Sequence, residues 1–556
     1  MEEPSFPTPV PGEQKRLVPG VERRALRTVS RSALLSLAFF IVACASQDST
    51  TPSGFDQSRA DRLFVAGYRD VAESYIDEVT VNQMAVAGLE GLSTIDPDIS
   101  VAIEREEIRI ALKGKEAAHF PQPDAGDFLA WANLTTSAIS AVRSKSKDLE
   151  QANAERLYET VFDGLLSELD QFSRYSGRDE ARLNRASRDG FGGVGIRIEV
   201  TDAGIQVLSI MEKTPAEKAG IRVDDLIVKI DGIASKGLSQ TEAVSRLRGR
   251  LHSKVRLEIK RKGSRLPRLV TVTRARIVQQ TVYIKRVDAI AHIAVTGFNQ
   301  NTTQNLSRKI REVAQKSGPE LKGYVIDLRG NPGGLLDQAV GVSDLFITEG
   351  RIVSTHGRHP DSEQFFDAEP DDIALGLPIV VLIDSNSASA SEIVAAALQD
   401  SGRAVIIGSI SYGKGTVQNV FRLPNQGELA LTWARFHAPS GYVLHGRGVL
   451  PDICTTRGID SADDVLAQLQ QGTMPIDHNV RNVSPDFDDP EALKLLRDHC
   501  PPRGTDAAVD LEVAERLLTE PSLYAQALGA PASGATARRS YQILATTPNT
   551  GGHDHQ

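Results

Sequence analysis

The sequence predicts a multidomain α/β protein with an N-terminal helical segment, a small β-rich module containing one helix, and a larger α/β core. Three patterns support this. Apolar residues return every three or four positions over about 60–170, short strand-like runs surround one helical run over about 190–275, and strands alternate with helices from about 277. With 556 residues, 40% of them hydrophobic, the chain is long enough for about two to four domains.

The N-terminus predicts an export signal over residues 1–44. An apolar run at 33–46 is too short to cross a bilayer comfortably, and its end, Ile41-Val42-Ala43-Cys44, resembles a bacterial lipoprotein processing site. That resemblance implies that Cys44 is lipidated. An uncleaved signal anchor and ordinary cleavage after a small residue are the alternatives, and every version exports the rest of the chain. The basic residues before the apolar run are Lys15, Arg16, Arg23, Arg24, Arg27 and Arg31.

Export would leave two cysteines, Cys454 and Cys500, in an oxidising compartment. They could form a disulfide that ties the C-terminal tail to the body, or they could be two separate buried thiols. The sequence alone leaves both readings open.

The segments that flank the folded body differ in composition. Residues 45–59 are polar and rich in Ser and Thr, which predicts a tether, and residues 60–186 are predicted to be helical. Residues 460–556 are rich in Asp, Pro and Gly and predict a partly disordered extension with one or two short helices. The terminal HDHQ is expected to be frayed tail, and no metal site or cofactor is expected.

The charge balance argues against nucleic acid as a partner. The formal net charge is −9, and the basic residues form no stripe beyond short runs such as KRKGSR at 260–265. A nucleic-acid-binding function is therefore not expected.

Residues 187–276 contain short strand-like runs around one helix, opened by the glycine-rich apolar loop FGGVG. The stretch EKTPAEKAGIRVDDLIVKIDG at 212–232 resembles the central part of a PDZ domain. The resemblance implies a groove at a strand edge, where a peptide adds as an extra strand. Its terminal carboxylate would meet backbone N–H groups of Phe191, Gly192, Gly193, Val194 and Gly195.

Residues 277–459 alternate strands and helices, which predicts a mostly parallel sheet with its chemistry at the C-terminal strand ends. Two loops fall there, RGNPGG at 329–334 and SNSASAS at 385–391. A serine at a strand-to-helix turn can act as a nucleophile, and Gly333 and Gly334 offer backbone donors. Alternatively, Ser389 and Glu392 are a helix capping box and the glycines are a plain turn.

A serine nucleophile needs a base, and Lys414 at the end of the next strand is the candidate. The surrounding GSISYGKGT at 408–416 is close to a phosphate-binding loop. Gly415 stands where that loop needs Ser or Thr, and a hairpin rather than a helix is predicted to follow, so nucleotide binding is not expected. His437 and His445 are alternative bases.

At this point the chain resembles the carboxy-terminal processing, or tail-specific, serine peptidases. The resemblance covers about 150–456, and it implies a core of the Clp-protease/crotonase-like type. It also implies that Ser389 is the nucleophile, Lys414 the general base and Gln418 the residue that orients the lysine, with oxyanion N–H groups from Ala390 and one of Gly333 and Gly334. LDQFS at 169–173 stands where the family usually has LDPHS. The carrying motifs are DLRGNPGG (327–334), SNSASASEIVAAALQDSGRA (385–404), SYGKGTVQ (411–418) and GRGVLPDI (446–453).

These readings together predict an exported serine endopeptidase of the bacterial cell envelope, facing the periplasm and anchored by lipid at Cys44. It would cleave protein substrates near their C-termini through an acyl-enzyme, with the PDZ domain holding apolar substrate tails. A lipoprotein adaptor is a candidate partner. The rival from another class is a non-catalytic scaffold that only binds peptides through its PDZ domain.

Overall fold

The computed structural model describes residues 54–456, 461–472, 489–502 and 508–529. The predicted signal, Cys44, most of the tether and the terminal HDHQ lie outside these ranges. In the part of the chain that is described, no helix combines the length and the apolar character that a bilayer crossing requires.

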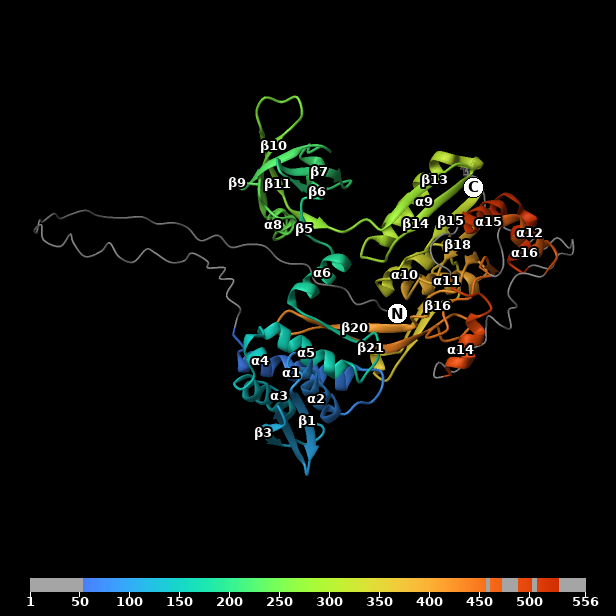
Figure 1. The fold of residues 1–556 in the computed structure, drawn as a ribbon. Helices are drawn as coiled ribbons and strands as arrows, with labels where there is room; N and C mark the ends of the chain where they lie inside the picture. The colour runs from blue at the N-terminus through green and yellow to red at the C-terminus, as the bar shows by residue number, and fades with distance from the viewer. Residues whose placement is uncertain (1–53, 457–460, 473–488, 503–507, 530–556) are drawn as a thin grey trace, which may run out of the picture. The chain divides into compact units, whose positions relative to one another are not determined.

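The first folded part is a helical bundle that also contains a small sheet (Figure 1). The sheet was not expected, because residues 60–186 were predicted to be helical throughout. Residues 99–121 instead form two antiparallel hairpins, since Ile and Val alternate with polar residues and the turns at Arg105-Glu106 and Lys113-Gly114 take positive φ angles. The elements are α1 (Gln57–Ser74), α2 (Val81–Glu90), β1 (Ile99–Glu104), β2 (Glu107–Leu112), β3 (Lys115–Pro121), α3 (Phe128–Arg143), α4 (Lys147–Gln151) and α5 (Ala154–Leu166).

Helix α6 (Arg178–Asp189) leads into the β-rich module, whose sheet has the order β11-β10-β8-β7-β6. Strand β6 therefore lies at the edge of the sheet, with α8 beside it. The short strands β5 and β12 pair and join the beginning of the module to its end. The elements are β5 (Phe191–Gly193), β6 (Ile196–Thr201), β7 (Gly204–Ile210), α7 (Pro215–Lys218), β8 (Leu226–Ile230), β9 (Ile233–Ala234), α8 (Gln240–Leu247), β10 (Lys254–Lys260), β11 (Arg268–Thr273) and β12 (Ala275–Ile277).

The central sheet of the core has six strands in the order β13-β14-β15-β18-β19-β22. All neighbours are parallel except β13 and β14, as the alternation of strands and helices predicted. Helices α9, α10 and α11 pack on one face. The elements are β13 (Val282–Val287), β14 (Ile290–Val295), α9 (Thr302–Ser317), β15 (Gly323–Asp327), α10 (Leu336–Asp344), β18 (Ile379–Ile383), α11 (Ala390–Asp400), β19 (Val405–Gly408) and β22 (Ile453–Cys454).

Helices from beyond residue 460 cover the other face of this sheet (Figure 1). Val325, Val380 and Leu382 point to that face and pack with α12 (Ala462–Gln470), α15 (Ala508–Thr519) and α16 (Pro521–Ala527). Helices α12, α15 and α16 therefore supply part of the core, where a partly disordered extension with one or two short helices had been expected. A parallel sheet buries apolar residues on both faces, so its second face needs a cover.

A second sheet, β17-β16-β21-β20 with β4 added to β21, adjoins the core. The predicted hairpin after Lys414 is confirmed, because β20 and β21 are antiparallel. Leu423, Leu429 and Leu431 of this hairpin share a hydrophobic cluster with the N-terminal helices. The elements are β4 (Arg174–Ser176), β16 (Arg351–His356), β17 (Gln364–Asp367), β20 (Thr416–Arg422) and β21 (Glu428–His437).

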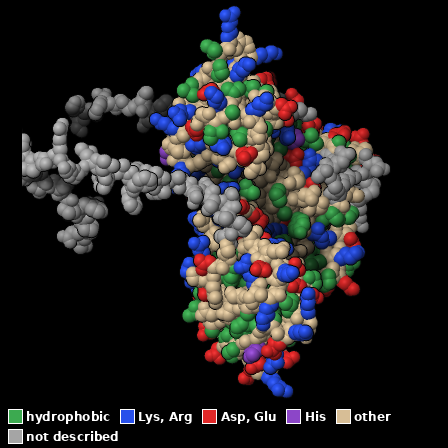
Figure 2. Space-filling view, turned by 60° about the vertical axis from the view of Figure 1, so that its left-hand side comes forward, with side chains coloured by type: hydrophobic (Ala, Val, Ile, Leu, Met, Phe, Trp, Pro, Cys, Tyr) green, Lys and Arg blue, Asp and Glu red, His purple; other side chains and the backbone are tan. Residues whose placement is uncertain are grey.

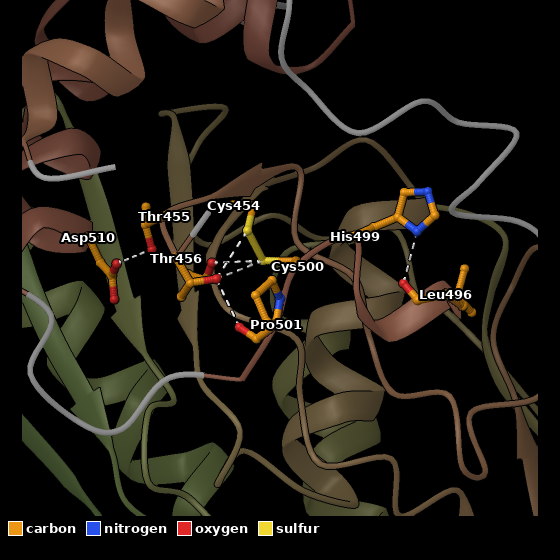
Figure 3. The surroundings of a disulfide bond; sticks show 9 residues. Cys454, Thr455, Thr456, Leu496, His499, Cys500, Pro501 and Asp510 are labelled. Carbon is orange, nitrogen blue, oxygen red and sulfur yellow. Dashed lines mark hydrogen bonds between the residues drawn. A yellow bond between two sulfur atoms is a disulfide. The ribbon is translucent and has the colours of Figure 1, made fainter. Parts of the chain in front are cut away.

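Cys454 at the end of β22 and Cys500 after α14 (Pro490–Arg497) form a disulfide (Figure 3). This settles the pairing that the sequence left open. The bond joins the edge of the central sheet to a segment 46 positions further along the chain.

Candidate active site

Ser389 lies where β18 passes into α11, as the first turn of the helix begins. Its φ and ψ angles are 55° and −114°, a strained conformation for a residue with a side chain. Strain of this kind costs about 1–3 kcal/mol and is concentrated at functional sites. The side chain is partly exposed, so the strained turn presents a hydroxyl that a substrate can reach.

Lys414 lies in the loop between β19 and β20, and its ammonium nitrogen is 5.2 Å from the centre of the Phe172 ring. Burial lowers the pKa of Lys414, and the charge of Arg174 lowers it further, while Asp170 and Glu392 oppose the shift. A lysine with a lowered pKa is a better base near neutral pH.

The element after Lys414 is strand β20, so the chain lacks the helix that a phosphate-binding loop needs at this point.

The Glu392 carboxylate brings the serine turn and the lysine loop together. One oxygen, Oε2, accepts the backbone N–H of Ser389 at 2.7 Å and that of Lys414 at 2.9 Å. The other, Oε1, accepts the Gly413 N–H at 2.6 Å and the Ser411 hydroxyl at 2.5 Å. Glu392 is fully buried; burial raises the pKa of its carboxyl and the four donors oppose that rise.

Glu392 had been considered only as half of a helix capping box. The structure keeps that contact with Ser389 and adds three donors from residues 411–414. A charged residue inside the otherwise apolar run SEIVAAAL was the available signal for such a role. Among the described residues, no hydrogen bond joins the Ser389 hydroxyl to the Lys414 ammonium.

Gln418 was predicted to orient Lys414. Its side-chain amide instead donates to Thr416 at 2.9 Å and to Thr432 at 3.3 Å. Thr432 in turn donates to Asp170 of the LDQFS segment at 3.2 Å. No hydrogen bond between Gln418 and Lys414 exists in the described ranges, so the orienting role stays a prediction.

Two of the three candidate oxyanion donors, Ala390 and Gly333, lie next to the serine. Ala390 begins α11, so its N–H has no partner within the helix. Gly333 lies close by, since a Cβ added there would be 2.9 Å from Ser389 Cβ, but its N–H donates to Asn331 Oδ1 at 2.9 Å. The Gly334 N–H has no hydrogen-bond acceptor among the residues described. Ala390 and Gly334 are thus the donors that remain available.

Asn331 is a further residue that the sequence reading missed. It is fully buried, and its side-chain amide donates to the Val295 carbonyl at 2.7 Å. The backbone carbonyl of Asn331 accepts the Ala388 N–H at 3.0 Å and the Ser391 hydroxyl at 2.9 Å. Asn331 therefore ties the RGNPGG loop to the serine turn.

Of the two histidines considered as bases, His437 lies in the second sheet, whereas His445 lies beside Phe172, the same ring that faces Lys414. The His437 ring is 4.5 Å from that of His356 in the second sheet, and the His445 ring meets Phe172 edge-on at 5.9 Å. Burial lowers the pKa of His437, with a smaller effect from His356. Within the described ranges, no cluster of three or more His, Cys, Asp or Glu side chains could hold a metal ion.

The predicted peptide-binding loop precedes the edge strand β6. The carbonyls of Val194 and Gly195 accept the N–H groups of Ala216 and Met211 at 2.9 and 3.0 Å, which fixes the loop. Gly195 has φ 87°, and a Cβ there would collide with Thr214. Upstream, Phe191 and Gly193 pair with β12.

A change at Arg174 should move the pH dependence of activity. The Arg174 charge lowers the pKa of Lys414, so Arg174→Gln should raise that pKa. A base works after losing its proton, so the acid limb of the kcat/KM profile should move to higher pH. Arg174→Lys keeps the charge and should leave the limb in place. A limb that stays or moves to lower pH in Arg174→Gln would contradict this.

Figure 2 shows acidic and basic side chains interspersed over the visible face, with no broad basic patch. This agrees with the formal net charge of −9.

Comparison with known proteins identifies two regions. Residues 289–455 match peptidase family S41, and residues 206–261 match the PDZ domain. The chain is 42% identical over 301 residues to a carboxy-terminal-processing protease of Bartonella bacilliformis, covering 54% of this chain and 69% of that protein. It is 34% identical over 312 residues to the carboxy-terminal processing protease CtpA of Bacillus subtilis, covering 56% and 66%. A solved photosystem II D1 C-terminal processing protease is 25% identical, with a TM-score of 0.35, over 71% of this chain and 92% of that one.

Proposed function

This chain belongs to peptidase family S41 and is a serine-type peptidase with a PDZ domain, and on that premise we propose that it cleaves exported proteins near their C-termini through a Ser389–Lys414 dyad. The observation that carries the proposal is the shared Glu392 oxygen, which accepts the backbone N–H groups of both residues. A partly exposed, strained serine and a lysine with a lowered pKa supply the nucleophile and the base.

The reaction follows from these positions. Uncharged Lys414 takes the proton of the Ser389 hydroxyl as the oxygen attacks the substrate carbonyl carbon. The N–H groups of Ala390 and Gly334 donate to the oxyanion that forms. The Lys414 ammonium then gives its proton to the leaving amine as the peptide bond breaks. A water molecule, deprotonated by Lys414, hydrolyses the Ser389 ester and releases the new C-terminus.

We also propose that the PDZ domain binds the substrate tail. Strand β6 is an edge strand, so a peptide can extend the sheet beside it. Helix α8 lies along this edge, where the Gln240 side chain donates to the Ile198 carbonyl at 3.2 Å. The tail carboxylate would lie at the Phe191–Gly195 loop.

A peptide substrate with an apolar tail, prepared with a free and with an amidated C-terminus, tests the function. The enzyme should cleave both, and amidation should raise KM by about tenfold, because hydrogen bonds to a charged group are worth about 1.5–3 kcal/mol. The kcat values should agree within about twofold. Mass spectrometry of the products locates the cut. Equal KM values would contradict carboxylate capture, and the absence of cleavage at any concentration would contradict the peptidase proposal.

Export and lipid anchoring at Cys44 belong to the same proposal and rest on the sequence of residues 1–44. The two carboxy-terminal processing proteases compared above come from bacteria, where such lipoprotein signals occur. Cell fractionation checks the anchor: the native chain should sediment with membranes, and Cys44→Ser should not. A lipoprotein adaptor remains a candidate partner of the exported form.

A further inference from the structure

Helix α14 lies against the loops that position Lys414. Its last residue, Arg497, directs one guanidinium nitrogen, Nη1, toward three backbone carbonyls. The distances are 3.4 Å to Tyr412, 3.4 Å to Gly446 and 3.1 Å to Arg447. Tyr412 and Gly413 immediately precede Lys414, so one side chain of the C-terminal segment joins the lysine loop to the 446–448 loop.

The contact is close because the loops present glycines to α14. A Cβ added at Gly413 or Gly448 would be 3.3 or 3.2 Å from Arg497 Nη1. A Cβ at Gly446 would be 2.9 Å from Leu493 of the same helix. Arg497 is half-buried; burial lowers the pKa of its guanidinium, and the Glu392 carboxylate opposes that shift. Arg497 is thus close enough to interact electrostatically with the carboxylate that holds both Ser389 and Lys414.

The disulfide fixes α14 in this place. Cys500 follows α14 and is bonded to Cys454 of the central sheet, and its carbonyl accepts the Ile410 N–H at 3.3 Å. Leu496 of α14 packs with both cysteines, Ile410 and Leu450 in one buried cluster. Figure 3 shows Thr456 between the sulfur atoms and the Pro501 carbonyl, and at the right the His499 ring in hydrogen-bond contact with the Leu496 carbonyl.

We propose that Arg497 is a positioning residue for the catalytic lysine, and that the Cys454–Cys500 disulfide holds it in place. Arg497 touches neither substrate nor reacting atoms; it acts by holding the carbonyls of the loop that ends at Lys414. The proposal rests on the role of Lys414 given above and adds a residue from beyond the segment that matches the peptidase family. Cleavage should therefore depend on a covalent bond distant in sequence from the dyad.

Substitutions on one helix test the first half. Arg497→Ala should lower kcat by about tenfold to a hundredfold and change KM by less than about twofold, because a misplaced base slows the chemical step rather than substrate binding. Arg497→Lys should restore most of kcat, since an ammonium has three N–H donors for the three carbonyls. The control is Lys494→Ala, which removes an exposed cation on α14 and should have wild-type kinetics. Wild-type kcat in Arg497→Ala, or no rescue by lysine, would overturn the proposal.

A double-mutant cycle tests the second half. The pair Cys454→Ala and Cys500→Ala should lower kcat about as much as Arg497→Ala does. Adding Arg497→Ala to the disulfide-free chain should then lower kcat little further, because both changes remove the same constraint on the lysine loop. Additive losses, or full kcat without the disulfide, would overturn the link. Circular dichroism and thermal unfolding report whether the disulfide-free chain folds; if it does not, the Arg497 variants, which keep the disulfide, decide the proposal.

Lys414→Ala separates this inference from the proposed function. If Lys414→Ala is inactive and Arg497→Ala is fully active, only the positioning role is wrong. If Lys414→Ala keeps full activity, the dyad itself is wrong.

Discussion

Alanine at Lys414 should abolish peptide cleavage, lowering kcat by about ten-thousand-fold or more. Lys414 is the base that accepts the Ser389 proton in the proposed mechanism, so its removal leaves the nucleophile without activation. Ser389→Ala should give the same loss. The double variant should be no worse than either single one, because the two residues act in one step.

The measurement is kcat for an apolar-tailed peptide, with thermal unfolding to confirm the fold. Lys316→Ala, which removes an exposed lysine near the end of α9, is a matched control and should be fully active. Ser389→Ala keeps the backbone strain of the turn but lacks the nucleophile, so the fold should persist. Activity near the wild-type level in either dyad variant would refute the mechanism.

Glutamine at Glu392 should damage both stability and catalysis, although it differs from glutamate by one group. Each carboxylate oxygen accepts two donors, so in either orientation the new amide nitrogen faces two hydrogen-bond donors. Two buried donors without an acceptor predict a loss of about 2–4 kcal/mol in the free energy of unfolding. The serine turn and the lysine loop would also separate, so kcat should fall by about a hundredfold.

Urea unfolding measures the first effect and steady-state kinetics the second. The matched control is Glu512→Gln, which makes the same change at an exposed position of α15 and should alter neither quantity by much. Wild-type stability together with wild-type kcat in Glu392→Gln would show that this carboxylate is not needed to join the two halves of the site.

The sequence predicted the elements whose signal is local. Alternation of apolar strands and amphipathic helices was enough for the parallel sheet, and both functional loops follow strands of that sheet, at the ends of β15 and β18. The hairpin after Lys414 was also predicted, because apolar residues recur at every second position on both sides of a Pro/Gly turn.

What the sequence did not reveal depends on contacts between distant segments. Nothing local to Glu392 shows that residues 411–414 will donate to it, and nothing local to Arg497 points to three carbonyls that lie 50, 51 and 85 residues earlier. The sheet at 99–121 was missed because its short strands lie between strongly periodic helices. One or two short helices were expected beyond residue 460, but their packing on the central sheet was not, because the composition of this segment resembles that of a tail.

The departure LDQFS gains a physical meaning from the structure. Phe172 takes the place where the family usually has histidine, and the centre of its ring lies 5.2 Å from the Lys414 ammonium. An aromatic face attracts the charged ammonium and also keeps water away from it, two effects that shift the pKa of the lysine in opposite directions. Asp170 and Arg174 of the same segment add one charge of each sign.

The helices that cover the second face of the central sheet limit how far this polypeptide can be shortened. Cutting the gene after the family-matched segment, at residue 455, would strip α12, α15 and α16 from Val325, Val380, Leu382, Val405 and Ile407. A fragment designed from sequence similarity alone would thus expose the apolar second face of the central sheet to water. We expect such a fragment to aggregate in the expression host. Useful deletion boundaries lie downstream of residue 529.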